Sequence, residues 1–246
     1  MTTTIRGLFI TDVHAPDHIN IDGVYKYARD FKPNIIILGG DIIDALGMYG
    51  ADQVSPTESV ITKWNLLYKR DILLIKTLLQ SLPKCKIVYL EGNHEYRYTR
   101  LSKRYPELIG DRYNFKRDAL PKNARWIPYG TYDSIYHLAD VIFLHGNAYP
   151  DSHAKYYSST YPGFKVVYGH LHHYQAYSNR RALINSRLNY AVTPGCLTHL
   201  EPEYKQGKAH QWQNGFISFI GTENSIILNT HTIEHGRFYV GTKEYK

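Results

Sequence analysis

Side chains that commonly bind metal ions recur along this chain, and each of them follows a short apolar run. The candidate ligands are Asp12, His14, Asp41, Asn93, His145, His170 and His172. Carboxylate, imidazole and amide donors favour Mn, Fe, Zn or Ni over a metal ion that prefers thiolate ligands. A carboxylate such as that of Asp41 has two oxygens and can bridge two cations. Two cations about 3.5–4 Å apart can share an activated water and hold a phosphate during in-line displacement, so the pattern indicates phosphoester hydrolysis.

The apolar runs that precede these ligands predict buried strands. They span residues 8–10, 35–38, 87–90, 141–144 and 166–168. Short β-branched runs bounded by Gly or Asp are typical of strands covered on both faces. Open α/β sheets bind ligands in the crevice at the carboxyl ends of their strands, where all these side chains would meet. We expect Gly40, Gly92 and Gly169 to let the backbone turn sharply beside the metals.

The two halves of the chain differ in their predicted elements. Residues 22–30 read as a helix, and a second helix should begin at Ser55 as N-cap, with Glu58 completing a capping box, and end at Pro83. Alternating strands and helices over residues 5–91 predict parallel pairing. The later strands are short and joined by turns, so we expect them to form a second sheet stacked on the first. They span residues 134–137, 141–144, 164–168, 190–193, 216–220 and 225–229.

Taken together, the fragments resemble the calcineurin-like metallophosphoesterase superfamily, whose pattern is D-x-H, G-D-x-x-D, G-N-H-[ED], H and G-H-x-H. The matching fragments are Asp12-Val13-His14, Gly40-Asp41-Ile42-Ile43-Asp44, Gly92-Asn93-His94-Glu95, His145 and Gly169-His170-Leu171-His172. The resemblance implies an α/β fold, a four-layer α/β/β/α sandwich of two stacked mixed β-sheets flanked by helices. We expect one metallophosphoesterase domain over residues 1–246.

The resemblance also implies a role for each residue. One metal would be held by Asp12, His14, Asp41 and His172, and the other by Asp41, Asn93, His145 and His170. His94 would not be a ligand; it would face the scissile phosphate and donate a proton or hydrogen bond to the leaving group. Asp44 would orient the His94 imidazole by a hydrogen bond. The expected cofactors are two divalent metal ions, with Mn favoured and Fe, Zn or Ni open.

Two features favour a phosphodiesterase or nuclease that acts on nucleic acid or nucleotides. Arg97, Arg100 and Arg104 fall at i, i+3 and i+7 and would share one helix face, so Arg97 and Arg100 are candidate substrate-binding residues. Residues 149–190 are rich in tyrosine and arginine, a combination that stacks and holds single-stranded nucleic acid. A solvated basic helix face remains an open alternative, and the 23 tyrosines of the chain weaken the second argument.

Other functions also remain open. A phosphomonoesterase such as a nucleotide monophosphatase needs the same metal pair and proton donor. A phosphoprotein phosphatase is disfavoured, because those members of the superfamily carry Arg and Gly where this chain has Ala45 and Ala15. A metal-bound scaffold without catalysis is the most remote alternative, since the ligand pattern is complete and both His94 and Asp44 are present.

The bulk composition sets further expectations. A formal charge of +7 favours encounter with polyanions, but it does not choose between nucleic acid, nucleotide and membrane surface. Cys85 and Cys196 cannot form a disulfide framework, which suggests a reducing compartment. We see no secretion signal and no apolar run of membrane-spanning length, so we expect a soluble cytoplasmic protein with no membrane partner. Spacing assigns no role to His18, His153, His173, His199 or His210, and oligomeric state and pathway stay open.

Overall fold

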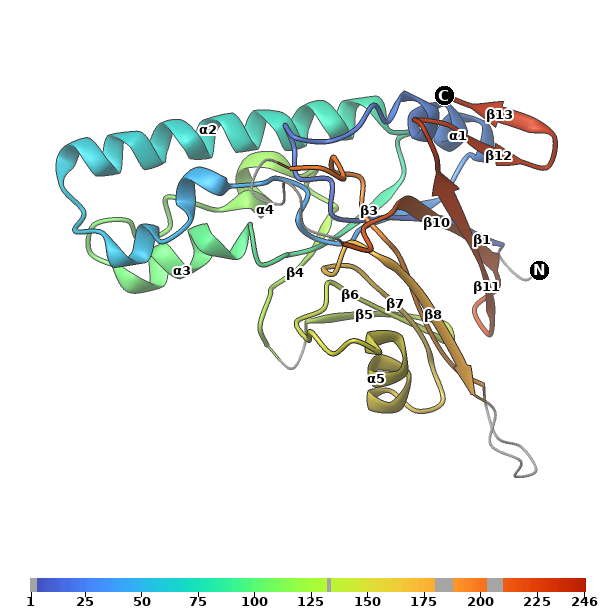
Figure 1. Ribbon diagram of the computed structural model, residues 1–246. Coiled ribbons are helices and arrows are strands. Elements are labelled where there is room, and N and C mark those ends of the chain that lie inside the picture. The colour runs from blue at the N-terminus through green and yellow to red at the C-terminus, as the bar shows by residue number, and fades with distance from the viewer. Residues whose placement is uncertain (1–3, 132–133, 180–187, 203–209) are drawn as a thin grey trace.

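Two mixed β-sheets stack on each other at the centre of the computed structural model, which describes residues 4–131, 134–179, 188–202 and 210–246 (Figure 1). The first sheet contains, in spatial order, β11 (Ile226–Ile233), β10 (Asn214–Gly221), β1 (Ile5–Ile10), β2 (Ile35–Leu38), β3 (Lys86–Leu90) and β4 (Arg125–Ile127). The second contains β5 (Ile135–Leu138), β6 (Val141–Leu144), β7 (Lys165–Tyr168), β9 (Asn189–Pro194) and β8 (Tyr174–Asn179).

Helices cover the outer faces of both sheets. They are α1 (Asp22–Phe31), α2 (Glu58–Ser81), α3 (Tyr96–Arg104), α4 (Phe115–Ala119) and α5 (His153–Thr160), with short 3₁₀ turns at Leu46–Met48 and Ala51–Gln53. In Figure 1, α1 and α2 lie above the first sheet and α5 lies below the second. A hairpin of β12 (Phe238–Val240) and β13 (Lys243–Tyr245) packs beside α1. No helix in the described ranges is both long and apolar enough to cross a membrane.

Alternation along β1 explains the layering. Leu8 and Ile10 pack in the core beneath the helices, together with Ile75 of α2, whereas Phe9 points between the sheets and meets Phe143 of β6. A third core joins the outer face of the second sheet to α5 through side chains that include Tyr157. Since successive strand residues point to opposite faces, strands buried on both sides read as continuous apolar runs. The predicted four-layer α/β/β/α sandwich is confirmed.

Two of the predicted strands belong to the other sheet. The segments at 216–220 and 225–229 are β10 and β11, which extend the first sheet rather than joining the second: β10 pairs antiparallel with β1, and β11 pairs antiparallel with β10. Gly7 of β1 permits this pairing, because a Cβ there would lie 2.0 Å from the ring of Phe219. The order of strands in a sheet is set by contacts between residues distant in sequence. The apolar pattern of a single segment therefore does not predict which strand it pairs with.

The helix predictions were correct in place and partly wrong in detail. The helix expected over 22–30 is α1, and the second helix stops at Ser81, shortly before Pro83. Its start was predicted incorrectly. The N-cap is Thr57 with an extended backbone and no side-chain capping bond, so Ser55 lies outside the helix and the capping box is not formed.

Candidate metal centre

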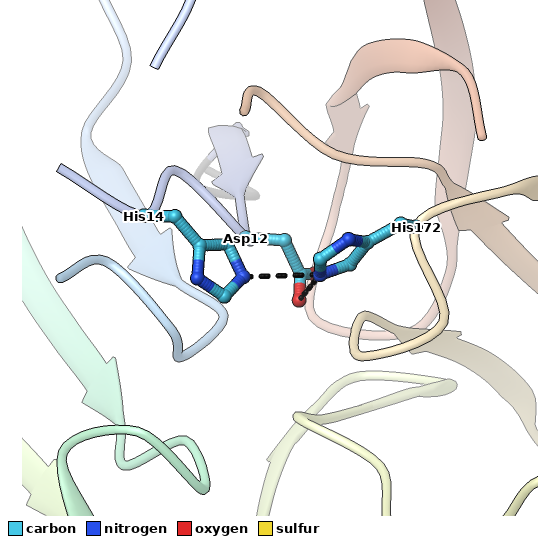
Figure 2. Close-up of side chains that lie close together, drawn as sticks. All are labelled: Asp12, His14 and His172. Carbon is cyan, nitrogen blue, oxygen red and sulfur yellow. Dashed lines mark hydrogen bonds and ion pairs between the residues drawn. The ribbon is translucent and has the colours of Figure 1, made fainter. Parts of the chain in front are cut away.

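The first set of candidate ligands gathers at the carboxyl end of β1. Asp12 and His14 follow this strand, and His172 reaches them from the loop after β7 (Figure 2). The Nε2 atoms of His14 and His172 are 3.0 Å apart, and His172 Nε2 is 3.3 Å from Asp12 Oδ1. These three side chains are buried, and their donor atoms form a group within 4.8 Å that is able to hold one metal ion.

The second set draws its side chains from the strand ends of both sheets. Asp41 follows β2, while His145 and His170 follow β6 and β7, and their donor atoms also fall within 4.8 Å of one another. His145 Nε2 is 3.3 Å from Asp41 Oδ2 and 3.0 Å from the amide oxygen of Asn93, which follows β3. The structure therefore brings together all seven residues that the sequence singled out.

Asp41 occupies the place between the two sets. Its Oδ2 atom is 3.3 Å from His145 Nε2 and 3.9 Å from His14 Nε2, so one carboxylate faces a ligand of each set. Its Oδ1 atom accepts a hydrogen bond from the main-chain N–H of His94, at 2.9 Å. This position is the one that a bridging carboxylate requires.

The backbone that carries the ligands is strained. Five candidate ligands adopt left-handed backbone angles, with φ of 51° at Asp12, 52° at His14, 50° at Asp41, 80° at His170 and 64° at His172. This region costs non-glycine residues on the order of 1–3 kcal/mol each, and such strain clusters at functional sites. The fold holds these side chains in place at an energetic cost, which favours a built site over a chance cluster.

The glycines beside the ligands serve two different needs. Gly40 has φ of 91° and makes the sharp turn that was expected. Gly92 and Gly169 do not have left-handed angles, so the turning role expected of them is wrong. They permit close approach instead: a Cβ on Gly92 would lie 2.1 Å from Asp41 Oδ1, and one on Gly169 would lie 2.5 Å from Asp12 Oδ2.

His94 stands next to the cluster with both ring nitrogens engaged. Its Nδ1 atom donates to the main-chain carbonyl oxygen of Asp44. Its Nε2 atom is 3.1 Å from the guanidinium of Arg97, which also donates to the carbonyls of Asp44 and Ala45 at 2.9 Å each. The Asp44 carboxylate lies between two imidazoles, with Oδ1 3.3 Å from His14 Nδ1 and 3.5 Å from His94 Nδ1. Asp44 therefore contacts a candidate ligand as well as His94.

Burial and neighbouring charges shift the pKa values of the candidate ligands. Burial opposes ionisation of Asp41, but the imidazoles of His145 and His94 hold its pKa well below the usual value. Burial also disfavours protonated His145, yet the charge of Asp41 raises its pKa to about 9. Burial and the neighbouring His145 lower the pKa of His170 to about 4. A histidine binds a metal ion in its neutral form, so a cation at this site would displace a proton from His145.

Unpaired nitrogens in the cluster fit a metal ion. Both ring nitrogens of His170 and the Nδ1 atom of His172 are buried without a hydrogen-bond partner in the part of the chain that the structure describes. His145 Nδ1 donates to the Gly39 carbonyl at 2.8 Å, so Nε2, which faces Asp41 and Asn93, is the nitrogen that would bind a cation once its proton is displaced. Buried polar groups without partners are rare, and imidazoles fixed by a second hydrogen bond are typical of metal ligands. The donor set fits divalent cations.

Glu95 has a structural role that the sequence did not reveal. Its fully buried carboxylate accepts hydrogen bonds from the main-chain N–H groups of Asp41, Ile42 and Gly92 at 2.8–3.0 Å, and from the Tyr89 hydroxyl at 2.8 Å. It thereby holds the loop after β2 against the loop after β3. The only sequence signal was the Glu at the end of Gly92-Asn93-His94-Glu95. Predicting its role would have required knowing which loop lies beside it.

We expect Glu95→Gln to lower the free energy of unfolding by roughly 2–4 kcal/mol, because an amide N–H₂ would face main-chain N–H groups that lose their acceptor. Urea denaturation measures the change. Glu107→Gln is the matched control, since Glu107 is exposed and the same substitution there should stay within about 0.5 kcal/mol. Equal stability of the Glu95 variant and the wild type would contradict this role.

The other residues named from the sequence do not belong to the two ligand sets. Arg100 is half exposed and pairs with Asp52 at 2.7 Å, and Arg104 is exposed at the end of α3. His153 is buried away from the cluster, where it bonds to the Tyr168 hydroxyl at 2.5 Å and contacts His173. Of the tyrosines and arginines counted between 149 and 190, Arg180, Arg181 and Arg187 lie outside the described residues.

The fold and the cluster define a metallophosphoesterase, and comparison with known proteins agrees. The profile of the calcineurin-like phosphoesterase family matches residues 5–195. The chain belongs to this family. A search of curated proteins found no match.

Solved structures of similar fold include Vps29 proteins. Vps29 from Cryptosporidium parvum is 16% identical with a TM-score of 0.48, and 98% of each chain is covered. Zinc-complexed Vps29 from Entamoeba histolytica is 11% identical with a TM-score of 0.48, over 96% of each chain. A phosphoesterase predicted in Streptococcus pneumoniae TIGR4 is 12% identical with a TM-score of 0.39, over 100% of this chain and 99% of that one.

Proposed function

We propose that this protein is a metal-dependent phosphodiesterase that acts on nucleotides or nucleic acid. The observation that carries the proposal is the meeting of both ligand sets at the Asp41 carboxylate, which faces His14 at 3.9 Å and His145 at 3.3 Å. The proposed ligands of one cation are Asp12, His14, Asp41 and His172, and those of the other are Asp41, Asn93, His145 and His170. We propose manganese as the working pair, with Fe, Zn or Ni as alternatives.

Divalent cations at such a site supply Lewis acidity and a water of lowered pKa. The chain's own residues have the task of aligning the ester. His94 lies within reach of the cluster, since its Nε2 atom is 3.9 Å from Asp41 Oδ2. Burial lowers the pKa of His94, but Asp41 and Asp44 together raise it above the ordinary value. A protonated imidazole can give a proton to the departing alkoxide, which is the general-acid role that we propose.

Arg97 is proposed to bind the phosphate beside His94. Its guanidinium is anchored by two carbonyls and contacts His94 Nε2 at 3.1 Å. When Nε2 carries a proton, the two groups no longer form a donor–acceptor pair, and both can donate to an anionic oxygen. Arg100, one turn further along α3, pairs with Asp52 and is proposed to contact a neighbouring phosphate of a longer strand.

Exposed aromatic rings beside the cluster support a substrate with bases. Tyr149 is 73% exposed and its ring centre lies 4.7 Å from that of His170. Tyr49 is 79% exposed and lies 5.6 Å from the Arg97 guanidinium. Exposing a large aromatic ring to water is unfavourable. Stacking of a base on such a ring contributes about 1–3 kcal/mol per base in single-stranded complexes. These two rings flank the residues proposed to hold the phosphate.

The proposal is tested by comparing two esters with the same leaving group. The manganese-loaded protein should hydrolyse bis-p-nitrophenyl phosphate with a higher kcat/KM than p-nitrophenyl phosphate, because the proposed site binds a group on each side of the phosphorus. Activity confined to the monoester would favour a nucleotide monophosphatase. Bound metal with no hydrolysis of either ester, or of a broad phosphoester panel, would favour a scaffold that has kept its ligands without catalysis.

A further inference from the structure

A cavity of about 430 Å³ opens directly beside the metal centre and shares His145 with it. Its walls come from the ends of β3 and β6, from the segment after β4 and from α5, the helix below the second sheet in Figure 1. Ligand cavities typically measure roughly 300–1,000 Å³, so this one has room for a small molecule. Its position means that a phosphate at the cluster would place its substituent at the cavity mouth.

Four tyrosines line the cavity, Tyr129, Tyr156, Tyr157 and Tyr161, and they differ in role. Tyr157 is buried, and its hydroxyl accepts hydrogen bonds from the main-chain N–H groups of Asn147 and Ala148 at 2.8 and 3.1 Å. It therefore secures the segment that follows His145. Tyr156 is 46% exposed, and Tyr129 is half-buried with its ring centre 5.9 Å from that of His145. These two rings retain surface for a ligand.

The cavity also contains a buried hydrogen-bond acceptor. Glu91 is 2% exposed, and its carboxylate accepts from the Thr99 hydroxyl at 2.5 Å and from the main-chain N–H of Tyr129 at 2.8 Å. Burial raises the pKa of Glu91 to about 7, so above that pH the ionised form prevails, with about four acceptor positions of which roughly two remain for a ligand. An aromatic wall with one fixed acceptor matches a planar heterocycle that carries N–H donors.

We propose that this cavity is the base-binding subsite of the enzyme. It holds the base of the nucleotide whose phosphate lies at the metal cluster, with Tyr156 and Tyr129 against the ring faces and Glu91 facing the base N–H groups. The inference rests on the proposed function and narrows it: the substrate is a nucleotide recognised through its base. A ligand without an aromatic base would leave the tyrosine wall unused.

Binding of a nucleotide without turnover tests the subsite. The manganese-loaded protein is titrated by calorimetry with AMP and with ribose 5-phosphate, which have the same phosphate and differ by the base. We expect AMP to bind at least tenfold more tightly. Tyr156→Ala should weaken AMP binding by about 5–150-fold, the range that stacking energies of about 1–3 kcal/mol imply, and leave ribose 5-phosphate binding unchanged. Tyr156→Phe keeps the ring and should retain most of the AMP affinity.

Control variants separate the subsite from the fold and from catalysis. Tyr239→Ala removes another exposed tyrosine, 59% exposed on β12, and should not change AMP binding. Equal affinity for AMP and ribose 5-phosphate, or AMP binding unchanged in Tyr156→Ala, would overturn the subsite. A protein that prefers AMP but hydrolyses no diester keeps the subsite and loses the proposed function. A protein that hydrolyses diesters but binds AMP and ribose 5-phosphate equally would keep the proposed function and lose the subsite.

Discussion

Replacing Asp41 with alanine is expected to reduce the manganese bound per chain from a pair of ions to less than one. The Asp41 carboxylate faces His14 at 3.9 Å and His145 at 3.3 Å, and it belongs to a candidate metal group with each of them. Without it, each cation loses a negatively charged donor, and the repulsion between two divalent ions is no longer compensated. Elemental analysis after loading and desalting gives the count directly.

Thermal denaturation provides an independent measure of the same loss. A ligand that binds only the folded state stabilises it by about 2.7 kcal/mol at a hundred times its dissociation constant. Wild-type protein should therefore melt at a higher temperature with manganese than without, and Asp41→Ala should lose most of this increment. Asp30→Ala is the matched control, because Asp30 is an exposed carboxylate paired with Lys243 at 2.7 Å. Two full sites in the Asp41 variant would refute the bridging role.

The strand ends were predictable because their signal is local. Apolar runs such as 35–38 and 141–144 mark buried strands, and residues that follow parallel strands meet at one edge of a sheet. Both runs are strands with those bounds, but β2 belongs to the first sheet and β6 to the second, so the 3.3 Å approach of Asp41 to His145 also depends on how the two sheets stack. The pairing of β10 with β1 was not predictable in this way, since it depends on the close fit of Phe219 against Gly7.

The contacts that Arg97 and Glu95 make with the ligand-bearing loops could not be derived from the spacing of residues in the sequence. Helical periodicity predicted that Arg97 shares one helix face with Arg100 and Arg104, but its bonds to the carbonyls of Asp44 and Ala45 arise because the loop after β2 folds against the start of α3. The hydrogen bonds of Glu95 have the same origin. Motif spacing reports which side chains are available, whereas the folded loops decide which atoms they meet.

His94→Ala is expected to keep the full metal content and to lose about 10²–10⁴-fold in kcat on a diester with a poor leaving group, the usual contribution of a positioned proton donor. His94 contributes no ligand in the proposed assignment, so the two ligand sets remain complete. A poor leaving group such as the ribose hydroxyl of a dinucleotide needs a proton as the bond breaks. A p-nitrophenolate leaves without one, so bis-p-nitrophenyl phosphate should lose far less.

The dependence on the leaving group distinguishes proton donation from a structural role of the same imidazole. His94 Nδ1 donates to the Asp44 carbonyl and its Nε2 accepts from the Arg97 guanidinium, so removing His94 takes away one contact of that guanidinium and leaves its bonds to the carbonyls of Asp44 and Ala45. If the loss came only from a displaced Arg97, both esters would suffer alike, because both present the same phosphate oxygens. His137→Ala, an exposed histidine on β5, controls for the substitution itself. A dinucleotide turnover close to wild type in His94→Ala, with both metals bound, would remove His94 from the chemistry and leave the proton to come from water.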